Sequence, residues 1–253
     1  MQRLKDKVTI ITGAGRNIGE AAAHLFAKEG AKVAVVDLNG EAASKVANDI
    51  AEEGGVAEAF AADVSDEASV DKLFNDIVAK FGRVDGLVNN VAISDNKNML
   101  EITLDEWNRT LKVTLTAPFL MTRAFAKKVI ETKAGGGKVV NVGSTSGFFG
   151  RDRAVAYTAA KGGLVNLTKS MAVQLAPHNI RVTLLVPNKI GSPVGKDTFD
   201  PTRPVKNLCN NRPGVPDDVA GPMLFLLSSE SDFITGTSLF VDAGCSVLMP
   251  GNE

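Results

Sequence analysis

Short apolar runs rich in β-branched residues alternate with longer amphipathic stretches along the whole chain. Most of these runs are almost continuously apolar, as expected for parallel strands that are buried on both faces. Strands that alternate with helices indicate right-handed βαβ units. The pattern therefore predicts an α/β fold with a doubly wound parallel sheet of about seven strands and helices on both faces. The predicted strands are residues 7–12, 32–37, 56–63, 84–90, 138–144, 181–187 and 238–244.

Helical periodicity is clearest over residues 67–82, where apolar side chains recur at the spacing of one buried helical face. Gly82 follows at the position where a C-terminal cap glycine belongs. The stretch therefore predicts a helix packed against the sheet. Its apolar face is made of Val70, Leu73, Phe74, Ile77, Val78 and Phe81.

The pattern indicates one domain over residues 1–253, because no linker, internal repeat or low-complexity tract interrupts it. The least regular stretch runs from about residue 188 to residue 216 and contains five prolines and few apolar residues. Irregular segments of that length in a compact domain are usually lids, binding loops or disordered. We expect a substrate loop there.

The numbers of basic and acidic residues indicate which classes of partner the protein can be expected to bind. The chain has 28 Lys and Arg against 29 Asp and Glu, so its formal net charge of −1 gives no reason to expect nucleic acid or an anionic membrane. No apolar run approaches the roughly 20 residues of a membrane span, and the N-terminal apolar run is too short for a signal peptide. We therefore expect a cytoplasmic protein whose partner is a small molecule.

The cysteines and histidines offer little chemistry of their own. Cys209 and Cys245 form no CxxC motif, so one disulfide is possible, and two unpaired thiols in a reducing cytoplasm are favoured. His24 and His178 have no carboxylate or cysteine neighbours at metal-binding spacing. No metal site is expected.

Six of the predicted strands end in glycine, acidic, amide, hydroxyl or proline residues. A loop that only joins a strand to the next helix would not require these residue types. In an open α/β sheet, ligands bind outside the carboxyl ends of the strands, and these positions all lie along that edge. Their convergence predicts a ligand site. The positions are the glycine turn after the first strand, Asp37, Asp63, Asn89 with Asn90, Ser144, and Pro187 with Asn188.

The turn after the first strand has the composition of a phosphate cradle. Gly13, Gly15 and Gly19 lie between a strand and a helix, where the backbone can approach a ligand and the helix N-terminus offers free N–H groups. Glycine-rich turns also occur for packing alone. Directly after the first strand of a βαβ unit, this turn favours dinucleotide binding.

Asp37 ends the second strand, where an acidic side chain would accept hydrogen bonds from the adenosine ribose hydroxyls and repel a 2′-phosphate. This placement favours NAD over NADP. The carboxylate could instead cap the next helix, although Asn39 is also available for that role. Arg16, within the glycine turn, could meet a 2′-phosphate.

Tyr157 is the one tyrosine of the chain, and Lys161 lies on the same helical face four residues later. This spacing alone is common, because a tyrosine ring packs well on a lysine stem. Ser144, however, ends the fifth strand thirteen residues earlier, and the connection is long enough to bring all three side chains together. A tyrosine needed only for packing could be phenylalanine, of which the chain has 12.

Together these motifs resemble the short-chain dehydrogenase/reductase family, of the type with roughly 250 residues, over nearly the whole chain. The similar segments are "TGAGRNIG", Asp63 with Val64, "NNVA", the Tyr157–Lys161 pair and "VPNKIGS". The resemblance implies a Rossmann-like fold and hydride transfer between a nicotinamide cofactor and a secondary alcohol or ketone. It also implies a homotetramer, with the helices around residues 107–130 and 154–175 at the interfaces.

The resemblance assigns roles to particular residues. Tyr157 would be the general acid and base, Lys161 would lower its pKa and bind the nicotinamide ribose, and Ser144 would orient the substrate oxygen. The implied catalytic set is Ser144, Tyr157, Lys161 and Thr114. The implied cofactor contacts are Gly13, Arg16, Asn17, Ile18, Gly19, Asp37, Leu38, Asp63, Val64, Asn90, Ala92, Tyr157, Lys161, Pro187, Ile190 and Ser192.

Several positions depart from the family pattern. Thr114 stands where the family has a catalytic asparagine in a bent helix, and we expect its hydroxyl to support the bend by bonding the carbonyl one turn earlier. Asn17 replaces a glycine of the first turn, and asparagine tolerates the left-handed backbone conformation better than most residues. Ala92 and Asn188 also replace glycines, and Ser192 replaces a threonine.

Two further functions stay open. An NADPH-linked 3-oxoacyl thioester reductase would share the fold, although Asp37 argues against it. A low-turnover cofactor-binding sensor is suggested by the departures at Thr114, Asn17 and Asn188. The substrate itself is not identified by the sequence. In the segment "GFFGRDR", Arg151 and Arg153 are possible anion contacts, and solvated loop charge is the favoured interpretation of both.

Overall fold

Seven parallel strands form one sheet in the computed structural model, which describes residues 2–191, 194 and 208–248. The strands are β1 (Val8–Thr12), β2 (Lys32–Asp37), β3 (Val56–Ala61), β4 (Gly86–Asn89), β5 (Gly137–Val142), β6 (Ile180–Pro187) and β7 (Ser238–Val241). Their order in the sheet is β3-β2-β1-β4-β5-β6-β7, and all neighbours pair in parallel. The predicted doubly wound parallel sheet is confirmed.

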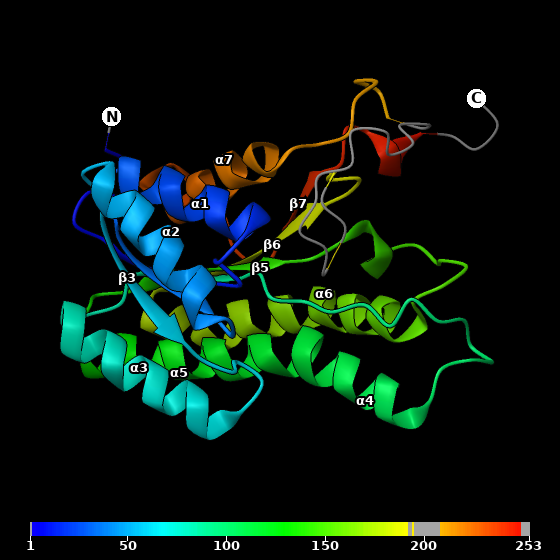
Figure 1. Cartoon of the computed structure of the whole chain (residues 1–253), viewed down its shortest axis with the longest axis horizontal. Helices are drawn as coiled ribbons and strands as arrows, with labels where there is room; N and C mark the ends of the chain where they lie inside the picture. Colours follow the sequence, from blue (N-terminus) through cyan, green and yellow to red (C-terminus); the bar gives the residue numbers. More distant parts are fainter. Residues whose placement is uncertain (1, 192–193, 195–207, 249–253) are drawn as a thin grey trace.

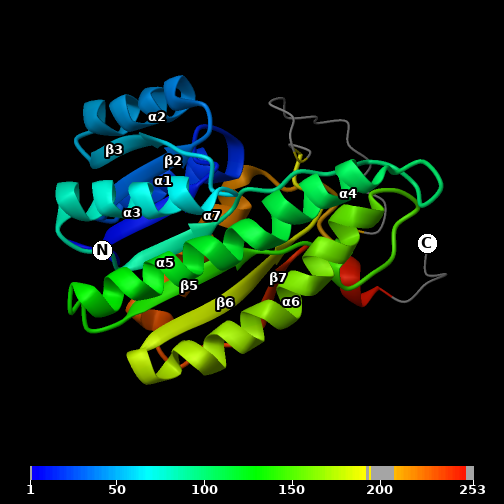
Figure 2. The ribbon, with the colours of Figure 1, turned by 90° about the horizontal axis from the view of Figure 1, so that it is seen from below.

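Helices cover both faces of this sheet (Figures 1 and 2). Helices α1, α2 and α7 lie on one side, and α3, α4, α5 and α6 lie on the other. In the described part of the chain, no helix has both the length and the apolarity that crossing a bilayer requires. The bounds are α1 (Asn17–Lys28), α2 (Gly40–Glu52), α3 (Glu67–Phe81), α4 (Leu104–Leu111), α5 (Ala117–Glu131), α6 (Val155–Leu175) and α7 (Pro216–Leu227), with the π-helix η1 (Lys112–Thr116) and the 3₁₀ turns η2 (Thr145–Gly147), η3 (Ala176–His178), η4 (Ser229–Ser231) and η5 (Cys245–Val247).

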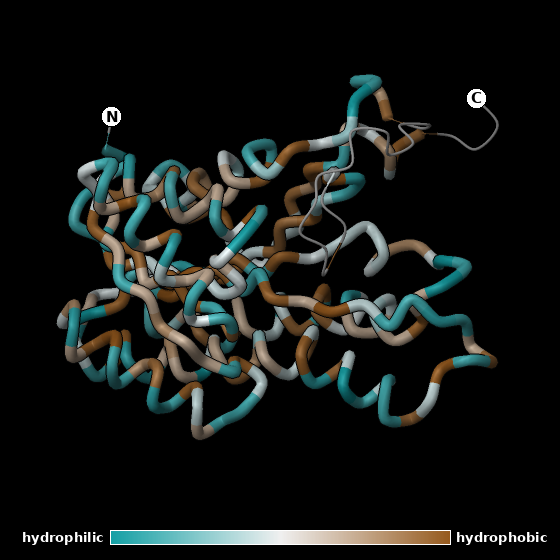
Figure 3. Tube along the Cα trace, in the orientation of Figure 1, coloured by the Kyte–Doolittle hydropathy of each residue, from teal (hydrophilic) through white to brown (hydrophobic). Residues whose placement is uncertain are grey.

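Two apolar layers hold the sheet between its helices, because successive side chains of a strand point to opposite faces. In β1, Ile11 packs into the layer that includes Phe26 of α1, and Ile10 packs into the layer that includes Phe74 of α3. The four side chains are buried, and each stabilises the fold by about 2 kcal/mol. Figure 3 shows the strands as apolar segments between helices whose outer turns are more polar.

The predicted helix over residues 67–82 is confirmed as α3, which ends at Gly82 with a left-handed φ of 80°. The third strand stops two residues before Asp63, and the fifth stops two residues before Ser144. Both side chains instead accept bonds from local backbone N–H groups, Asp63 from Ser65 and Ser144 from Ser146. The apolar runs in the sequence therefore extend beyond the last paired residues of β3 and β5.

The expected loop over residues 188–216 needs one correction, because Pro216 begins α7 rather than ending the loop. Proline is favoured at the first turn of a helix, where its missing N–H costs no hydrogen bond. An isolated bridge between Ile190 and Gly214 joins the two described ends of the segment. Residues 192–193 and 195–207, including the predicted contact Ser192, lie outside the described residues.

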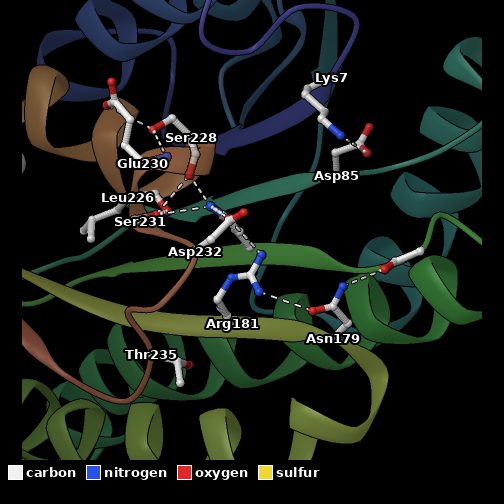
Figure 4. Close-up of polar contacts among 12 residues, drawn as sticks. Lys7, Asp85, Asn179, Arg181, Leu226, Ser228, Glu230, Ser231, Asp232 and Thr235 are labelled. Carbon is white, nitrogen blue, oxygen red and sulfur yellow. Dashed lines mark hydrogen bonds and ion pairs between the residues drawn. The ribbon is translucent and has the colours of Figure 1, made fainter.

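Ion pairs and hydrogen bonds tie the amino ends of the strands together at the opposite edge of the sheet (Figure 4). The buried Lys138 ammonium of β5 lies 2.7 Å from the Asp232 carboxylate and donates to Ser231 Oγ at 3.2 Å. Arg181 of β6 pairs with the same carboxylate at 3.1 Å. Burial lowers the pKa of Lys138, and hydrogen bonding to Lys138 lowers the pKa of Asp232. The polar side chains of this edge are thus engaged with one another.

Candidate functional site

The carboxyl ends of the strands open into a cleft of about 1010 Å³. The cleft crosses from β1 to β4, where the strand order reverses and α/β sheets bind their ligands. The lining includes most of the residues that the sequence predicts as a site. These are Gly13, Arg16, Asn17, Ile18, Asp37, Leu38, Asp63, Val64, Asn90, Ala92, Ser144, Tyr157, Lys161, Pro187 and Ile190.

The first turn is shaped by the close approach of α1 to the end of β1. A Cβ atom on Gly19 would lie 2.2 Å from the Gly13 carbonyl oxygen, so no side chain fits there. Asn17 has a left-handed φ of 52°, which asparagine adopts more readily than most residues. The backbone conformation expected at Asn17 is therefore present. The N-terminus of α1 faces the cleft, as an anion-binding turn requires.

Asp37 is held beside this turn by two backbone N–H groups. Its Oδ2 accepts from Gly15 N at 3.0 Å, and its Oδ1 accepts from Asn39 N at 3.0 Å. Asn39, in turn, caps α2 by accepting from the N–H groups of Glu41 and Ala42. Asn39 therefore fills the helix-cap role, and the Asp37 carboxylate lines the cleft.

Asp63 and Asn90 continue the lining on either side of the turn. Asp63 accepts from the Ser65 backbone and hydroxyl at 2.9 and 2.7 Å, and these bonds, together with the charge of Lys112, lower the pKa of Asp63. Asn90 Nδ2 donates to the carbonyl oxygens of Thr12 and Gly13 at 3.1 and 3.2 Å. The end of β4 is thereby fixed to the glycine turn.

The far end of the cleft brings together Ser144, Tyr157 and Lys161, as the spacing predicts. Tyr157 and Lys161 are only 4% and 2% exposed. The Lys161 ammonium lies 5.6 Å from the centre of the Tyr157 ring and donates to Val142 O at 2.6 Å. A Cβ on Gly147 would lie 2.6 Å from Lys161 O, so a glycine at this position lets η2, with Ser144, pack on α6.

Burial is the largest cause of the pKa shifts of Tyr157 and Lys161, which both lie on α6. It raises the pKa of Tyr157, while the Ser144 side chain and the charge of Arg151 act in the opposite direction. Burial also lowers the pKa of Lys161 to about 7. The expected lowering of the tyrosine pKa by Lys161 stays a prediction, and the cationic side chain that opposes the effect of burial here is Arg151.

These residues fit a nicotinamide dinucleotide. The glycine turn leaves room for a pyrophosphate against backbone N–H groups, and a carboxylate follows where an adenosine ribose would lie. A buried phenol and ammonium line the other end of the same cleft. The geometry thus combines a nucleotide cradle with a group that can exchange a proton.

Comparison with known proteins decides the family. A family model described as enoyl-(acyl carrier protein) reductase matches residues 13–246. A cyclohexanol dehydrogenase of Acinetobacter sp. (strain SE19) is 34% identical, covering 95% of each chain, and a D-threitol dehydrogenase of Mycolicibacterium smegmatis is 36% identical, covering 97% of this chain and 95% of that one. A solved structure of a short-chain type dehydrogenase/reductase from Mycobacterium marinum has a TM-score of 0.88 and 30% identity, with 97% of each chain covered. This chain belongs to the short-chain dehydrogenase/reductase family. It is a nicotinamide-dependent oxidoreductase that acts on CH–OH groups.

Thr114, the main departure from the family pattern, lies in the π-helix η1 between α4 and α5. Its buried hydroxyl donates to Ile93 O and accepts from Ile93 N, both at 3.1 Å. The expected bond to the carbonyl one turn earlier is therefore wrong. A π-helix interrupts the α-helical run at the position of the expected bend, and the hydroxyl bonds it to the segment that follows β4.

Asp95 is a site residue that the sequence reasoning missed. Its Oδ1 accepts from Tyr157 N at 3.0 Å, and its buried Oδ2 has no partner among the described residues. Ala154, which precedes α6, has a φ of 69° and no side chain that could cap the helix. The absence of a capping residue before the Tyr157–Lys161 helix was the available signal, because an uncapped N-terminus needs an acceptor from elsewhere.

Other lining residues also come from segments that the motifs do not mark. Arg109 of α4 and Lys112 of η1 line the cleft, as do Cys245, Ser246 and Leu248 after β7. Their places depend on how α4 and the C-terminal segment pack over the sheet edge, and no local pattern encodes that packing. Cys245 and Cys209 are both unpaired.

Proposed function

We propose that this chain is an NAD(H)-dependent dehydrogenase that interconverts secondary alcohols and ketones, with Tyr157 as its general acid and base. One observation carries the proposal: a single cleft has the Asp37 carboxylate at its nucleotide end and the buried Tyr157, Lys161 and Ser144 at its other end. The named substrates of the cyclohexanol and D-threitol dehydrogenases support a small molecule with a secondary hydroxyl group as the substrate.

Tyr157 would take the hydroxyl proton during oxidation and return it during reduction. When bound, the nicotinamide ring supplies the hydride acceptor or donor. A base works best with a pKa near the working pH, whereas burial raises the pKa of this phenol. Positive charge close to the phenol must therefore favour its ionised form.

Lys161 would act beside the phenol rather than on the substrate. With its pKa lowered to about 7, the side chain is protonated in about half of the molecules at neutral pH. Its ammonium donates to Val142 O, and it also lines the cleft, where its remaining donors could reach a ribose hydroxyl. An accepting ribose would favour the charged form of Lys161 and thereby the phenolate.

Ser144 would orient the substrate oxygen. Its Oγ accepts from Ser146 N at 3.1 Å and donates to Ser146 Oγ at 3.2 Å. These two bonds hold the hydroxyl at the N-terminal end of η2. A substrate oxygen could replace Ser146 Oγ as the acceptor of that proton. The exchange leaves the backbone bond intact, so the side chain stays oriented.

The choice of NAD rests on Asp37. Its two oxygens already accept from Gly15 N and Asn39 N, and each retains lone pairs toward the cleft. A 2′-phosphate placed there would meet a like charge. Arg16 also lines the cleft, and it is the residue through which NADP could bind if this assignment fails.

We also propose that the enzyme is a homotetramer. Large apolar side chains are exposed on the helices opposite α1 and α7, including Leu104 (72%), Phe119 (41%) and Val173 (76%). Exposed apolar surface shared by neighbouring helices is typical of a contact between subunits. Sedimentation equilibrium tests this proposal, and a monomer at micromolar concentration would contradict it.

The reaction is tested by incubating the native protein with NAD and a panel of secondary alcohols, and with NADPH and a 3-oxoacyl thioester. Reduction of NAD by a secondary alcohol supports the proposal. Exclusive use of NADPH and the thioester would favour the 3-oxoacyl thioester reductase. Tight NAD binding with turnover of neither would indicate a sensor.

A further inference from the structure

Arg151 lies at the reaction end of the cleft. The loop between η2 and α6 carries it, and it lines the cleft together with Ser144, Phe149 and Tyr157. The Phe148 ring of the same loop packs against Phe240 of β7, with 4.9 Å between ring centres. This contact anchors the loop to the sheet beside the cleft.

The guanidinium of Arg151 has no ion-pair or hydrogen-bond partner within the described part of the chain. Some arginines on the surface pair with carboxylates, as Arg123 does with Glu67 and Arg212 does with Asp218. Arg151 instead presents its charge to the cleft, where it acts on the Tyr157 phenol. Its surroundings leave five N–H donors available.

Acidic side chains line only the other end of the cleft. Among the described residues the lining carboxylates are Asp37 and Asp63, which accept from backbone groups around the nucleotide cradle. Asp95 accepts from the Tyr157 backbone N–H and does not line the cleft. Besides Arg151, the basic side chains of Arg109, Lys112, Lys161 and Lys189 line the cleft. The space in front of Tyr157 is therefore basic.

We propose that Arg151 forms an anion subsite, which selects substrates that carry a carboxylate, sulfonate or phosphate group a few carbons from the reacting hydroxyl. The inference rests on the proposed function and names the substrate class of the same site. A guanidinium matches the paired oxygens of these anions with two parallel hydrogen bonds. Phe149 supplies an apolar wall for the intervening carbons.

Arg153 provides a matched control. It lies two residues after Arg151 in the same loop and is also exposed, but it does not line the cleft. Substituting either arginine by glutamine removes one positive charge from the loop. A general effect of charge would appear in both variants, whereas a contact with the ligand would appear only in Arg151→Gln.

Binding is measured by calorimetry on the enzyme saturated with NAD, with butyrate and butyramide as probes of equal shape. We expect butyrate to bind about 10- to 100-fold more tightly than butyramide to the native protein and to Arg153→Gln, and equally weakly to Arg151→Gln. Propanesulfonate and propyl phosphate, titrated in the same way, identify which anion fits best.

Turnover of 3-hydroxybutyrate and 3-hydroxybutyramide gives an independent readout, and Arg151→Gln should lower kcat/KM about 10- to 100-fold for the acid relative to the amide. Equal binding of butyrate and butyramide, no binding of any of the three anions, or a preference for the anion that survives in Arg151→Gln would overturn the subsite. If the subsite fails these tests, the native protein should still bind NAD and oxidise neutral alcohols. A native protein that does neither would overturn the proposed function instead.

Discussion

At the scale of single residues, the site depends on how burial changes two ordinary side chains. The sequence predicts the meeting of Tyr157, Lys161 and Ser144, because helical spacing and strand-end position are local properties. It does not predict their titration, which depends on the tertiary packing that leaves the phenol and the ammonium almost without solvent. The action of Arg151 on the phenol was missed for the same reason.

Lys161 should make the stability of the protein depend on pH. Its pKa is about 7 in the folded chain and about 10.4 when unfolded, so the unfolded state binds more protons between these values and stability rises with pH across that window. Lys161→Met should lack this component. Urea unfolding at pH 7, 8 and 9 should give a slope that is lower in the variant by up to about 1.4 kcal/mol per pH unit. Identical slopes would show that the native lysine titrates normally.

Asp37 should set the cofactor preference. In Asp37→Ser the negative charge that repels a 2′-phosphate disappears. We expect the native enzyme to prefer NAD, and the ratio of kcat/KM for NAD over NADP to fall by about 10-fold or more in the variant. A native preference for NADP, lost in Arg16→Gln, would assign cofactor choice to the arginine.

At the scale of elements, the segment that follows β4 holds two helices in place. It accepts from Tyr157 N through Asp95 at the start of α6, and it bonds Thr114 through Ile93 at the π-helix. The sequence predicts α6 and suggests the bend before α5, but it does not reveal these contacts, which join residues 62 and 21 positions apart. Periodicity within a helix says nothing about the loop that fixes its end.

Asp95 should be a positioning residue for the Tyr157 helix. Asp95→Ala removes the acceptor of Tyr157 N, and we expect a loss of about 1–3 kcal/mol in stability with a lower kcat. Asp95→Asn keeps an amide oxygen and should restore most of both. The dissociation constant for NAD should change little in either variant. A kcat that stays at the native value in Asp95→Ala, despite the lost stability, would limit Asp95 to a structural role.

Thr114 should support the bend through its hydroxyl. Thr114→Val keeps the shape and leaves the Ile93 N–H and C=O without that partner, so unfolding experiments should report a loss of about 1–3 kcal/mol. Thr114→Asn can donate and accept as the hydroxyl does, and should change turnover modestly or not at all. A rise of several orders of magnitude in the asparagine variant would mean that the native bend is catalytically impaired, which would favour the sensor.

At the scale of the whole molecule, the two edges of the sheet have different tasks. Polar side chains at the amino ends of the strands are paired with one another, while those at the carboxyl ends line an open cleft. The seven strands and the cleft were predictable because buried parallel strands are continuously apolar and their ends share an edge. The contributions of α4, η1 and η5 to the cleft were not, because they arise from packing between distant segments.

The most direct test of the central claim is the turnover of Tyr157→Phe with NAD and a secondary alcohol that the native enzyme oxidises. Removing the hydroxyl leaves the ring in its buried position and removes the group that takes the substrate proton. We predict that kcat falls by about 10²- to 10⁴-fold while the dissociation constant for NAD stays within about 3-fold of the native value. A variant that retains native kcat would contradict the account, because the proton would then be handled by another group.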